Sequence, residues 1–375
     1  KITYNIYMKI IFNTSKLISK IKNIAPTAEA KQTLAILGNM LVKVSDNKAK
    51  FIASDLEIEI MSEVECQTES DINFTIPAKK FLEVCNALSA HDEIQVYVAD
   101  NKADVIAGKS KVSLPTLPPD DFPLMSFDQS LSRSDISTAE LSKLINKTSF
   151  AMAYQDSRHF LNGLHLCSEE GKLVSVCTDG HRLAKYESDT SFDAEISIII
   201  PRKAIVEINR ILASFSDIKE NLTELSVNNN SLQVNLNEYL VTSKLIEGNY
   251  PNFNKVIPAS TTSKICVDKA LFKNSLNIIS KVTNQQYKGV KLTPSKSTLH
   301  LITSNTESEI GEDEIDATYD GDDMSIGFNI SYIQDVIDTI ESDSVDICIN
   351  DQNSGCILVG PSDTNSVFVI MPMRV

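Results

Sequence analysis

The sequence predicts an α+β protein built from three similar domains. One pattern occurs three times: a short apolar run of the kind found in strands, a sharp turn, and then apolar residues at helical spacing. The three copies occupy 75–88, 199–212 and 327–340. Their turn residues, Pro77, Pro201 and Asn329, lie 124 and 128 residues apart. This spacing is about the size of a whole domain and far exceeds the roughly 20 to 50 residues of a solenoid repeat.

The central copy shows why the pattern predicts a strand followed by a helix. Three isoleucines at 198–200 form a β-type run. Pro201 suits the first position of a helix, because the N–H that proline lacks has no intrahelical partner there. Ile205, Ile208 and Leu212 follow at helical spacing and therefore share one face.

The first domain is expected to begin at Met8, with residues 1–7 as an extension outside the fold. Its elements are predicted as a helix over 12–24, strands over 34–44 and 50–64 with a break near 54–55, the repeated pattern, and strands over 94–98 and 111–114. Four prolines between 115 and 123 then end regular structure. The polar stretch 126–134 is predicted to be the first linker.

The second and third domains are predicted from the same signals. The second has a helix over 138–151, strands over 161–167, 173–178 and 181–187, the repeated pattern, and strands over 222–227, 232–236 and 239–246. The third has a helix over 269–282, strands over 290–292 and 299–303, an acidic stretch over 307–323, the repeated pattern and strands to the C-terminus. Each domain thus pairs two amphipathic helices with half-buried strands, which implies α+β layers. The predicted boundaries are 8–126, 134–258 and 262–375.

Composition is that of an ordinary soluble globular protein, with 42% hydrophobic and 23% charged residues. No apolar run is long enough for a membrane span, and the start lacks a signal-peptide pattern, so a cytoplasmic location is expected. The seven cysteines are odd in number and form no C-x-x-C pair. This usage favours buried reduced thiols over a disulfide framework or a metal site.

Basic residues gather on the predicted helices, although the net charge of −15 alone argues against nucleic-acid binding. The helix that opens each domain carries two lysines four residues apart: Lys16 and Lys20, Lys143 and Lys147, Lys269 and Lys273. Like charges at this spacing share a face and repel by a few tenths of a kcal/mol. A solvated lysine face is the commoner explanation of such charge clusters, whereas the threefold repetition suggests that an external anion offsets the repulsion.

Some other helix positions support this interpretation, and others weaken it. The first two pattern helices add Lys79, Lys80, Arg202, Lys203 and Arg210, whereas the third is acidic, with Asp335, Asp338 and Glu341. A basic helical face would suit a duplex backbone held without sequence reading. Six helices about 10 Å apart span roughly 60 Å. A ring around a duplex needs a helix circle of about 110 Å, so two chains would close it.

Eight motifs closely resemble the bacterial DNA polymerase III β subunit, the sliding clamp family. They are T-L-A-I-L-G-N-M-L (33–41), S-D-L-E (54–57), T-I-P-A-K-K-F (75–81), S-L-P-T-L-P-P-D-D-F-P (113–123), N-G-L (162–164), T-D-G-H-R-L-A (178–184), G-F-N-I-S-Y (327–332) and V-I-M-P-M-R (369–374). The resemblance covers Met8 to Val375. It implies a homodimeric ring of six similar domains, with helices lining the hole and sheets outside, and it implies no catalysis and no cofactor.

The resemblance also implies partners. An ATP-driven clamp loader would place the ring on double-stranded DNA, and the ring would tether the replicative polymerase through its alpha subunit. Other polymerases and repair proteins would use short linear peptides and one pocket between the second and third domains. Its residues would be Leu161, Thr178, Gly180, His181, Arg182, Leu183, Pro251, Lys255, Val256, Tyr287, Asn329, Tyr332, Val369, Ile370, Met371, Pro372, Met373 and Arg374. Leu, Val and Met suit an adaptable apolar groove with a few polar groups to orient a peptide.

Two further residue sets follow from the resemblance. The DNA contacts would be Lys31, Lys79, Lys80, Gln155, His159 and Phe160. Lys31 stands where the family often has an arginine, and His159-Phe160 replaces an aromatic pair. The dimer contact would join Lys109, Lys111, Val112 and Leu114 of one chain to Lys281, Val282, Glu307, Glu309, Glu312 and Asp313 of the other. Lys281 stands where the family often has an apolar residue.

Enzymatic and metal-binding functions fit the residues less well. In T-D-G-H-R, Asp179 and His181 resemble an acid–base pair near Ser175 or Cys177, but an Asp-Gly hairpin turn explains the same residues. The five histidines are scattered, and the acidic 307–323 stretch lacks the order of an EF-hand, so a solvated acidic loop is expected there. No phosphate-binding loop of the G-x-x-x-x-G-K-[ST] type occurs. A scaffold that does not bind DNA is the remaining alternative.

Overall fold

The computed structural model describes residues 8–29, 34–99, 101–127, 132–192, 194–215, 221–284 and 286–374. The chain divides into two compact units. The first comprises Lys1–Ala139 with Val206–Leu245, and the second comprises Glu140–Ile205 with Ile246–Val375. Each unit is built on one antiparallel sheet, which has twelve strands among the described residues.

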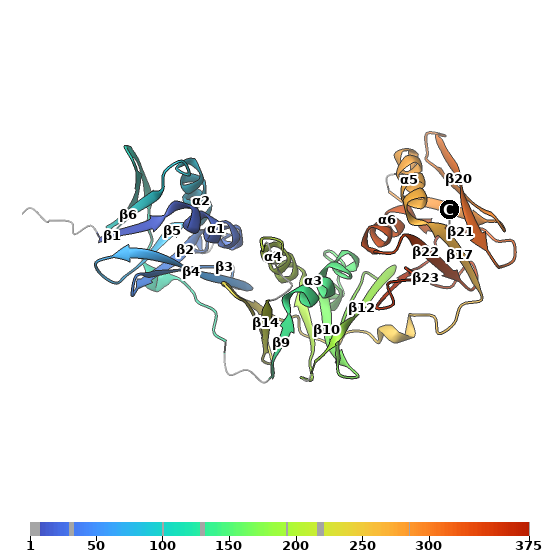
Figure 1. Ribbon diagram of the computed structural model, residues 1–375, viewed down its shortest axis with the longest axis horizontal. Helices are drawn as coiled ribbons and strands as arrows, with labels where there is room; N and C mark the ends of the chain where they lie inside the picture. Colours follow the sequence, from blue (N-terminus) through green and yellow to red (C-terminus); the bar gives the residue numbers. More distant parts are fainter. Residues whose placement is uncertain are drawn as a thin grey trace, which may run out of the picture. The chain divides into compact units, whose positions relative to one another are not determined.

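The first unit has strands in the order β8-β7-β6-β1-β4-β16-β15-β14-β9, with β2, β3 and β5 paired alongside. These are β1 Met8–Asn13, β2 Asn39–Ser45, β3 Lys48–Ser54, β4 Ile58–Thr68, β5 Ile72–Pro77, β6 Glu93–Ala99, β7 Lys102–Ala107, β8 Ser110–Pro115, β9 Ser132–Ser137, β14 Leu222–Val227, β15 Ser231–Leu236 and β16 Tyr239–Lys244. Helices α1 (Thr14–Ile24) and α2 (Ala78–Ala87) pack beside each other in this unit (Figure 1).

The second unit has strands in the order β13-β10-β11-β12-β24-β23-β22-β17-β20-β19-β18-β21. These are β10 Gly163–Glu169, β11 Lys172–Thr178, β12 Arg182–Ser191, β13 Ser197–Pro201, β17 Ser263–Asp268, β18 Gly289–Pro294, β19 Thr298–Ser304, β20 Ile310–Tyr319, β21 Ile326–Asn329, β22 Ser344–Ile349, β23 Cys356–Val359 and β24 Ser366–Ile370. Helices α5 (Lys269–Ile279) and α6 (Ile330–Thr339) pack beside each other. Helices α3 (Thr138–Asn146) and α4 (Arg202–Leu212) contain the borders between the units.

The chain nevertheless repeats one design three times, with eight strands and two helices in each repeat. β1, β9 and β17 each have six residues, and α1, α3 and α5 each begin at the next residue. α2, α4 and α6 likewise follow β5, β13 and β21 directly. The predicted α+β class and the six predicted helices are therefore confirmed within the described residues.

Strand pairing across repeat borders explains why three repeats give two units. The last strand of the second repeat, β16, pairs with β4, the fourth strand of the first repeat. In the same way β24 pairs with β12, in a register that sets Arg182 opposite Ile370 and Leu183 opposite Val369. Each sheet is therefore continuous across a border, which we call a junction.

Besides the outer strands β5, β9, β13 and β21, the described residues contain two strand edges without a partner strand. β8 ends the first sheet and pairs with β7 alone. In the second sheet, β20 pairs with β19 along 310–316 and with β17 through 317–319. The other side of 310–316 is therefore an open edge.

Several predicted boundaries were wrong. The segment 34–38 is a strand bridge and a 3-10 turn, and β2 begins only at Asn39, because a short apolar run cannot by itself distinguish a strand from a tight turn. The helix predicted to reach 151 ends at Asn146, and the helix predicted to reach 282 ends at Ile279; a 3-10 turn follows each. Of the predicted first linker, 128–131 lies outside the described residues and 132–134 already belongs to β9.

The acidic stretch is not the expected loop, because 310–319 forms β20. Alternate residues of β20 are half-buried, and α5 packs against this strand. A Cβ atom on Gly311 would lie 2.7 Å from Cγ2 of Val282, so only glycine lets the turn after α5 approach this closely. Glu312, Glu314 and Asp316 occupy exposed positions and Asp313 a half-buried one, so the strand has the composition of a solvated loop.

Candidate functional site

The turn between β11 and β12 positions the sequence T-D-G-H-R through its own hydrogen bonds. The Asp179 carboxylate accepts hydrogen bonds from the backbone N–H groups of His181 (2.9 Å) and Arg182 (3.0 Å). The Thr178 hydroxyl accepts from Gly180 N–H (3.1 Å) and donates to the Arg182 carbonyl (2.6 Å). Gly180 has a φ of +89°, a conformation that favours glycine.

These bonds disfavour the enzymatic interpretation of the same residues. The Asp179 carboxylate serves the backbone of its own turn. Burial raises the pKa of the Cys177 thiol to about 12, which opposes a reactive thiolate. Ser175 is buried and donates its hydroxyl hydrogen to the Leu144 carbonyl (2.8 Å). The segment is therefore a structural turn that presents Gly180 and His181 to solvent.

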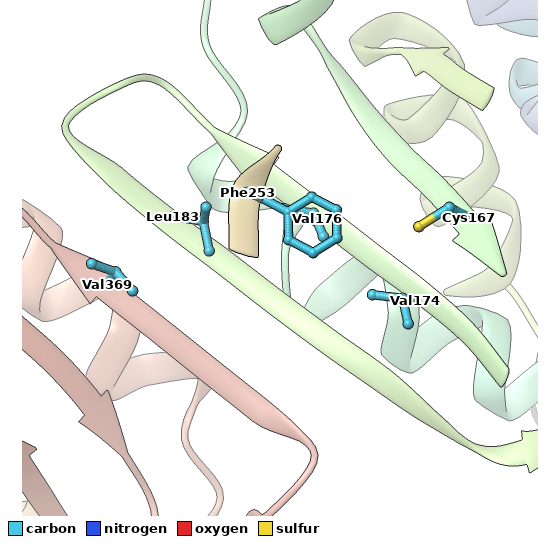
Figure 2. Close-up of a cluster of buried hydrophobic side chains, with 6 residues drawn as sticks. All are labelled: Cys167, Val174, Val176, Leu183, Phe253 and Val369. Atoms are coloured by element: carbon cyan, nitrogen blue, oxygen red, sulfur yellow. The ribbon is translucent and has the colours of Figure 1, made fainter. Parts of the chain in front are cut away.

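Behind this turn lies a cluster of buried apolar side chains that spans the β12–β24 junction (Figure 2). Its members are Cys167, Val174, Val176, Leu183, Phe253 and Val369. Leu183 and Val369 face each other across the two paired strands. They come from the second and third repeats, so the junction itself brings two of the predicted pocket residues together.

The segment 249–257 is fixed beside this cluster by its aromatic residues. The Tyr250 ring stacks on the His165 ring, with centroids 4.5 Å apart and planes 6° apart. Phe253 is buried in the cluster, and its ring lies 6.0 Å from that of His165. The predicted residues Pro251, Lys255 and Val256 are exposed on the same segment. We call 249–257 the strap, because the half-buried Tyr250 and the buried Phe253 hold it against the sheet.

The C-terminal residues are fixed by backbone hydrogen bonds. Met371 donates its N–H to the His181 carbonyl (2.8 Å), and Met373 donates its N–H to the Gly327 carbonyl (2.8 Å). Met371 remains 38% exposed, and Pro372 and Met373 are half-buried. The turn at Thr178–His181, the Leu183–Val369 pair, the strap and Met371 thus converge within the second unit. We call this set the second-junction groove.

Other predicted pocket residues have structural duties or lie further off. Arg182 faces the helices: its guanidinium carbon lies 4.4 Å from the Tyr332 ring centroid, and it donates to the Phe150 carbonyl (2.7 Å) and to Asp335. Asn329 caps α6 by accepting from Ser331 N–H (3.0 Å). Four predicted residues remain: Leu161 and Ile370 are buried, whereas Tyr287 and Arg374 are exposed.

The predicted DNA contacts occur in both units. Lys79 and Lys80 are exposed in the first turn of α2, where Lys80 forms an ion pair with Glu83 (2.5 Å). In the second unit Gln155 and His159 are exposed and Phe160 is half-buried. Lys31 lies outside the described residues.

The lysine pairs of the opening helices have acceptors inside the protein, so their mutual repulsion does not by itself require an external anion. Each of the six lysines meets an acceptor in its own unit: Lys16 with Glu65 (2.8 Å), Lys20 with Glu238, Lys143 with Glu140 (3.5 Å), Lys147 with Asp363 (2.7 Å), Lys269 with the Ile340 carbonyl and Lys273 with Asp338 (2.7 Å). Lys147 is even buried. The first unit also has a cavity of about 710 Å³ whose lining includes lysines 16 and 20 together with glutamates 63, 65 and 238.

The predicted dimer residues lie at the two open edges. Lys109 and Lys111 are exposed in and beside β8, where Val112 is half-buried and Leu114 is buried. In the second unit the exposed set is Lys281, Glu307, Glu309 and Glu312, whereas Val282 and Asp313 are half-buried. One edge is thus basic and the other acidic.

Some contributors to the groove were missed from sequence. His165, Tyr250 and Phe253 anchor the strap, yet no motif marks His165. The only local signal is the pair of aromatic residues around Pro251 in Y-P-N-F, a segment between strands that would have no reason to be aromatic unless it were packed. No group of His, Cys, Asp or Glu suited to hold a metal ion occurs in the described part of the chain. Nor is any helix of that part long and apolar enough to cross a membrane.

Comparisons with known proteins cover the whole of this architecture. Profiles of the DNA polymerase III beta subunit match in order: the N-terminal domain at 8–126, the central domain at 135–252 and the C-terminal domain at 254–374. A beta sliding clamp from Vibrio cholerae serotype O1 is 33% identical over 369 residues, which cover 98% of this chain and 100% of that protein. A beta sliding clamp from Escherichia coli K12 is 31% identical, with the same coverage. A crystal structure of a sliding clamp from Pseudomonas aeruginosa bound to griselimycin has a TM-score of 0.92 and 31% identity, covering 98% of this chain and 100% of that one.

Replacing His165 by leucine should remove a pH-dependent part of the stability. Burial lowers the pKa of His165 to about 4, from about 6.5 in an unfolded chain. The folded protein binds this proton less readily than the unfolded chain does. The stabilisation is therefore complete above pH 6.5 and is lost as the pH falls toward 4. Between pH 7 and pH 5, urea unfolding should show the wild type losing about 2 kcal/mol more than His165→Leu.

Tyr250→Phe is the matched control, because it keeps the ring that stacks on His165 and changes no histidine. Its pH dependence should match that of the wild type. Equal losses in the wild type and His165→Leu would show that His165 does not carry this part of the stability.

Proposed function

Because the chain belongs to the bacterial DNA polymerase III beta subunit family, the beta sliding clamps, we propose that it acts as a homodimeric ring enclosing duplex DNA. Family membership itself makes the chain a DNA sliding clamp of bacterial replication, a processivity subunit and not an enzyme. The proposal concerns how this chain performs that role: through the contact between copies, the contact with DNA and the docking of partners. The cytoplasm, where bacterial DNA is replicated, is its place of action.

The observation that carries the proposal is the pair of open strand edges. At the first junction the fourth strand of one repeat pairs with the last strand of the next, as β4 with β16. At the second junction β12 pairs with β24 in the same way. The remaining fourth strand is β20, and the remaining last strand is β8. A third junction of the same kind needs the β8 edge of a second copy, and two such contacts close a cyclic dimer.

Charge complementarity supports this pairing. Lys109 and Lys111 lie at the β8 edge, whereas Glu309, Glu312 and Asp313 lie along the open side of β20 and just before it. Opposite charges on paired edges favour the contact between two different edges and disfavour β8 with β8 or β20 with β20. The partner selected by these edges is a second copy of the same chain, head to tail.

Helix packing supplies a second line of support for the dimer. The tenth position counted from the start of each opening helix is Asn23 in α1, Lys147 directly after the end of α3, and Ile278 in α5. The first two are 4% and 5% exposed, because the next repeat covers them. Asn23 donates to the Tyr239 hydroxyl (3.2 Å), and Lys147 donates to Asp363 (2.7 Å). Ile278, at the third position of the same kind, is 56% exposed, so the proposed partner copy would cover it.

Enclosure explains how an acidic chain works on DNA. Lys79 has no ion-pair partner among the described residues, and Lys80, Gln155 and His159 are exposed, so these side chains are available to phosphate groups. The lysines of the opening helices are already paired within their units. A few weak contacts without base recognition permit sliding, while the closed ring prevents escape.

The second-junction groove is the proposed docking site for short peptides. Val256 and Met371, 47% and 38% exposed, offer an apolar surface beside the buried Leu183–Val369 pair, and Gly180 and His181 are exposed next to it. The peptides would come from the polymerase alpha subunit, the clamp loader, other polymerases and repair proteins. Griselimycin, which is bound in the related Pseudomonas aeruginosa clamp, would occupy the same groove in this chain.

Topological retention is the test of enclosure. When a bacterial clamp loader places the protein on nicked circular duplex DNA, gel filtration should recover it with the circles at high salt. Cutting the same circles once should release most of the bound protein, because a ring slides off free ends whereas a phosphate-binding protein stays. Equal retention on circles and linear molecules would contradict enclosure.

Ile278→Asp should weaken the dimer. Burial of an isoleucine contributes about 2 kcal/mol, and the proposed ring has two such contacts, so the substitution raises the dimer dissociation constant by a factor of about 1,000. Sedimentation equilibrium measures this constant. Leu271→Asp is the matched control on the same helix: Leu271 is 48% exposed, and its counterpart Lys16 is exposed at the first junction. A dimer unaffected by Ile278→Asp would mean that the third junction does not follow the other two.

Deletion of 371–375 should abolish docking without opening the ring. The deletion removes Met371 and the backbone hydrogen bond from Met371 to His181, so one side of the groove is lost. Griselimycin affinity, measured by isothermal titration calorimetry, should fall by at least about 30-fold. The sedimentation behaviour should stay that of the full chain. Retained affinity would place the docking site elsewhere.

A further inference from the structure

The first junction has the same backbone as the second-junction groove. β2, β3 and β4 begin at 39, 48 and 58, and β10, β11 and β12 begin 124 residues later, at 163, 172 and 182. The intervening turns match as well. The Asp55 carboxylate accepts from the N–H groups of Glu57 and Ile58 (both 2.9 Å), as Asp179 does one repeat later. Leu56 has a φ of +77°, which is positive like that of Gly180.

The strands that close the two junctions match in the same way. Lys244 donates its N–H to the Glu57 carbonyl (2.9 Å), as Met371 does to that of His181 (2.8 Å). The register places Thr242 opposite Glu59 in the first junction and Val369 opposite Leu183 in the second. The chain therefore contains two copies of one docking scaffold, one in each unit.

The segments that pack beside the two junctions, which we call their walls, also correspond. In the second junction the buried Phe253 is followed by Val256, which is 47% exposed. In the first junction the buried Phe122 is followed by Leu124, which is also 47% exposed. Phe122 packs with an apolar cluster of its own, formed with Ile36, Leu41 and Ile52. The wall of the first junction is therefore as apolar as that of the second.

The facing residues of the two junction strands, which we call the floor of each junction, differ in chemistry. Leu183 and Val369, 2% and 1% exposed, are replaced in the first junction by Glu59 and Thr242, 7% and 4% exposed. The Glu59 carboxylate accepts a hydrogen bond from Met125 N–H (3.0 Å), which ties the wall segment to the floor. Burial raises the pKa of Glu59, and the Met125 N–H group partly counters that shift.

We propose that Glu59 is a specificity-determining residue that keeps docking peptides out of the first junction, so that each chain accepts partners at its second junction alone. An apolar peptide side chain placed over Glu59 would have to cover the last exposed part of this carboxylate or break its bond to Met125. The cost of burying a carboxylate without new partners exceeds the gain from burying one leucine. This inference rests on the proposed docking function of the second-junction groove.

Exchange of the floor residues tests the proposal. The chain contains no tryptophan, so a single Leu124→Trp reporter gives a fluorescence signal from the first junction alone. In that background, E59L with T242V should produce a saturable fluorescence change on titration with griselimycin. Calorimetry should then find two molecules per chain where the unchanged chain binds one. The matched control, Leu124→Trp with Glu59 intact, should give no change at concentrations that saturate the second junction.

The possible outcomes separate this inference from the docking proposal. A Val256→Trp reporter in the otherwise unchanged chain should respond to griselimycin, and a silent reporter would overturn the groove assignment and this inference together. A responsive Val256→Trp reporter combined with a silent, folded E59L/T242V variant would overturn the role of Glu59 alone. If E59L/T242V fails to fold, E59Q/T242V, which keeps an acceptor for Met125, should give the fluorescence change with griselimycin in its place. The reciprocal change L183E should abolish the Val256→Trp response, and retained binding would contradict the proposal.

Discussion

Main-chain hydrogen bonding across repeat borders is the constraint on which the rest of the structure depends. A sheet edge cannot be left long and open without inviting another strand. In this chain each border resolves that problem by adding the last strand of one repeat to the fourth strand of the previous repeat, as in β4–β16 and β12–β24. Three repeats in one chain have only two borders between them, so only two such strand pairs can form within the chain. The edges at β8 and β20 are therefore a consequence of the repeat number.

The same constraint locates the docking groove. A junction brings two strands from different repeats side by side, and a following segment must then cross their outer face. In the second junction the strap does this, with Tyr250 and Phe253 packed on His165 and on the apolar cluster. The exposed apolar residues are thus presented by a rigid frame, which reduces the ordering that a docking peptide must drive. The first junction has the same backbone frame but polar floor residues. The two junctions therefore share the geometry of the site and differ in its chemistry.

Sequence reasoning recovered what depends on local periodicity. The helices after Pro77, Pro201 and Asn329 follow from apolar spacing, whereas the pocket residues stay a prediction from family motifs. It failed where a contact crosses a border. Lys147 reads as half of a solvated lysine pair, but its partner Asp363 lies 216 residues away in the next repeat. His165 carries no motif, because its role depends on Tyr250 and Phe253. Composition also concealed β20, whose alternating acidic residues have the hydropathy of a loop while Gly311 and Ile315 face the helix layer.

The pairing of the helix lysines bears on how tightly such a chain can hold DNA. Each internal ion pair removes a positive charge that phosphate groups would otherwise meet, and the net charge of −15 adds a general repulsion. Where these lysines are already neutralised, the affinity of the chain for DNA would be low and strongly dependent on salt. A protein that binds weakly can stay on DNA only if it is closed around it. In the proposed ring, the contact between strand edges of two copies, and not the contact with phosphate, would set how long the clamp remains in place.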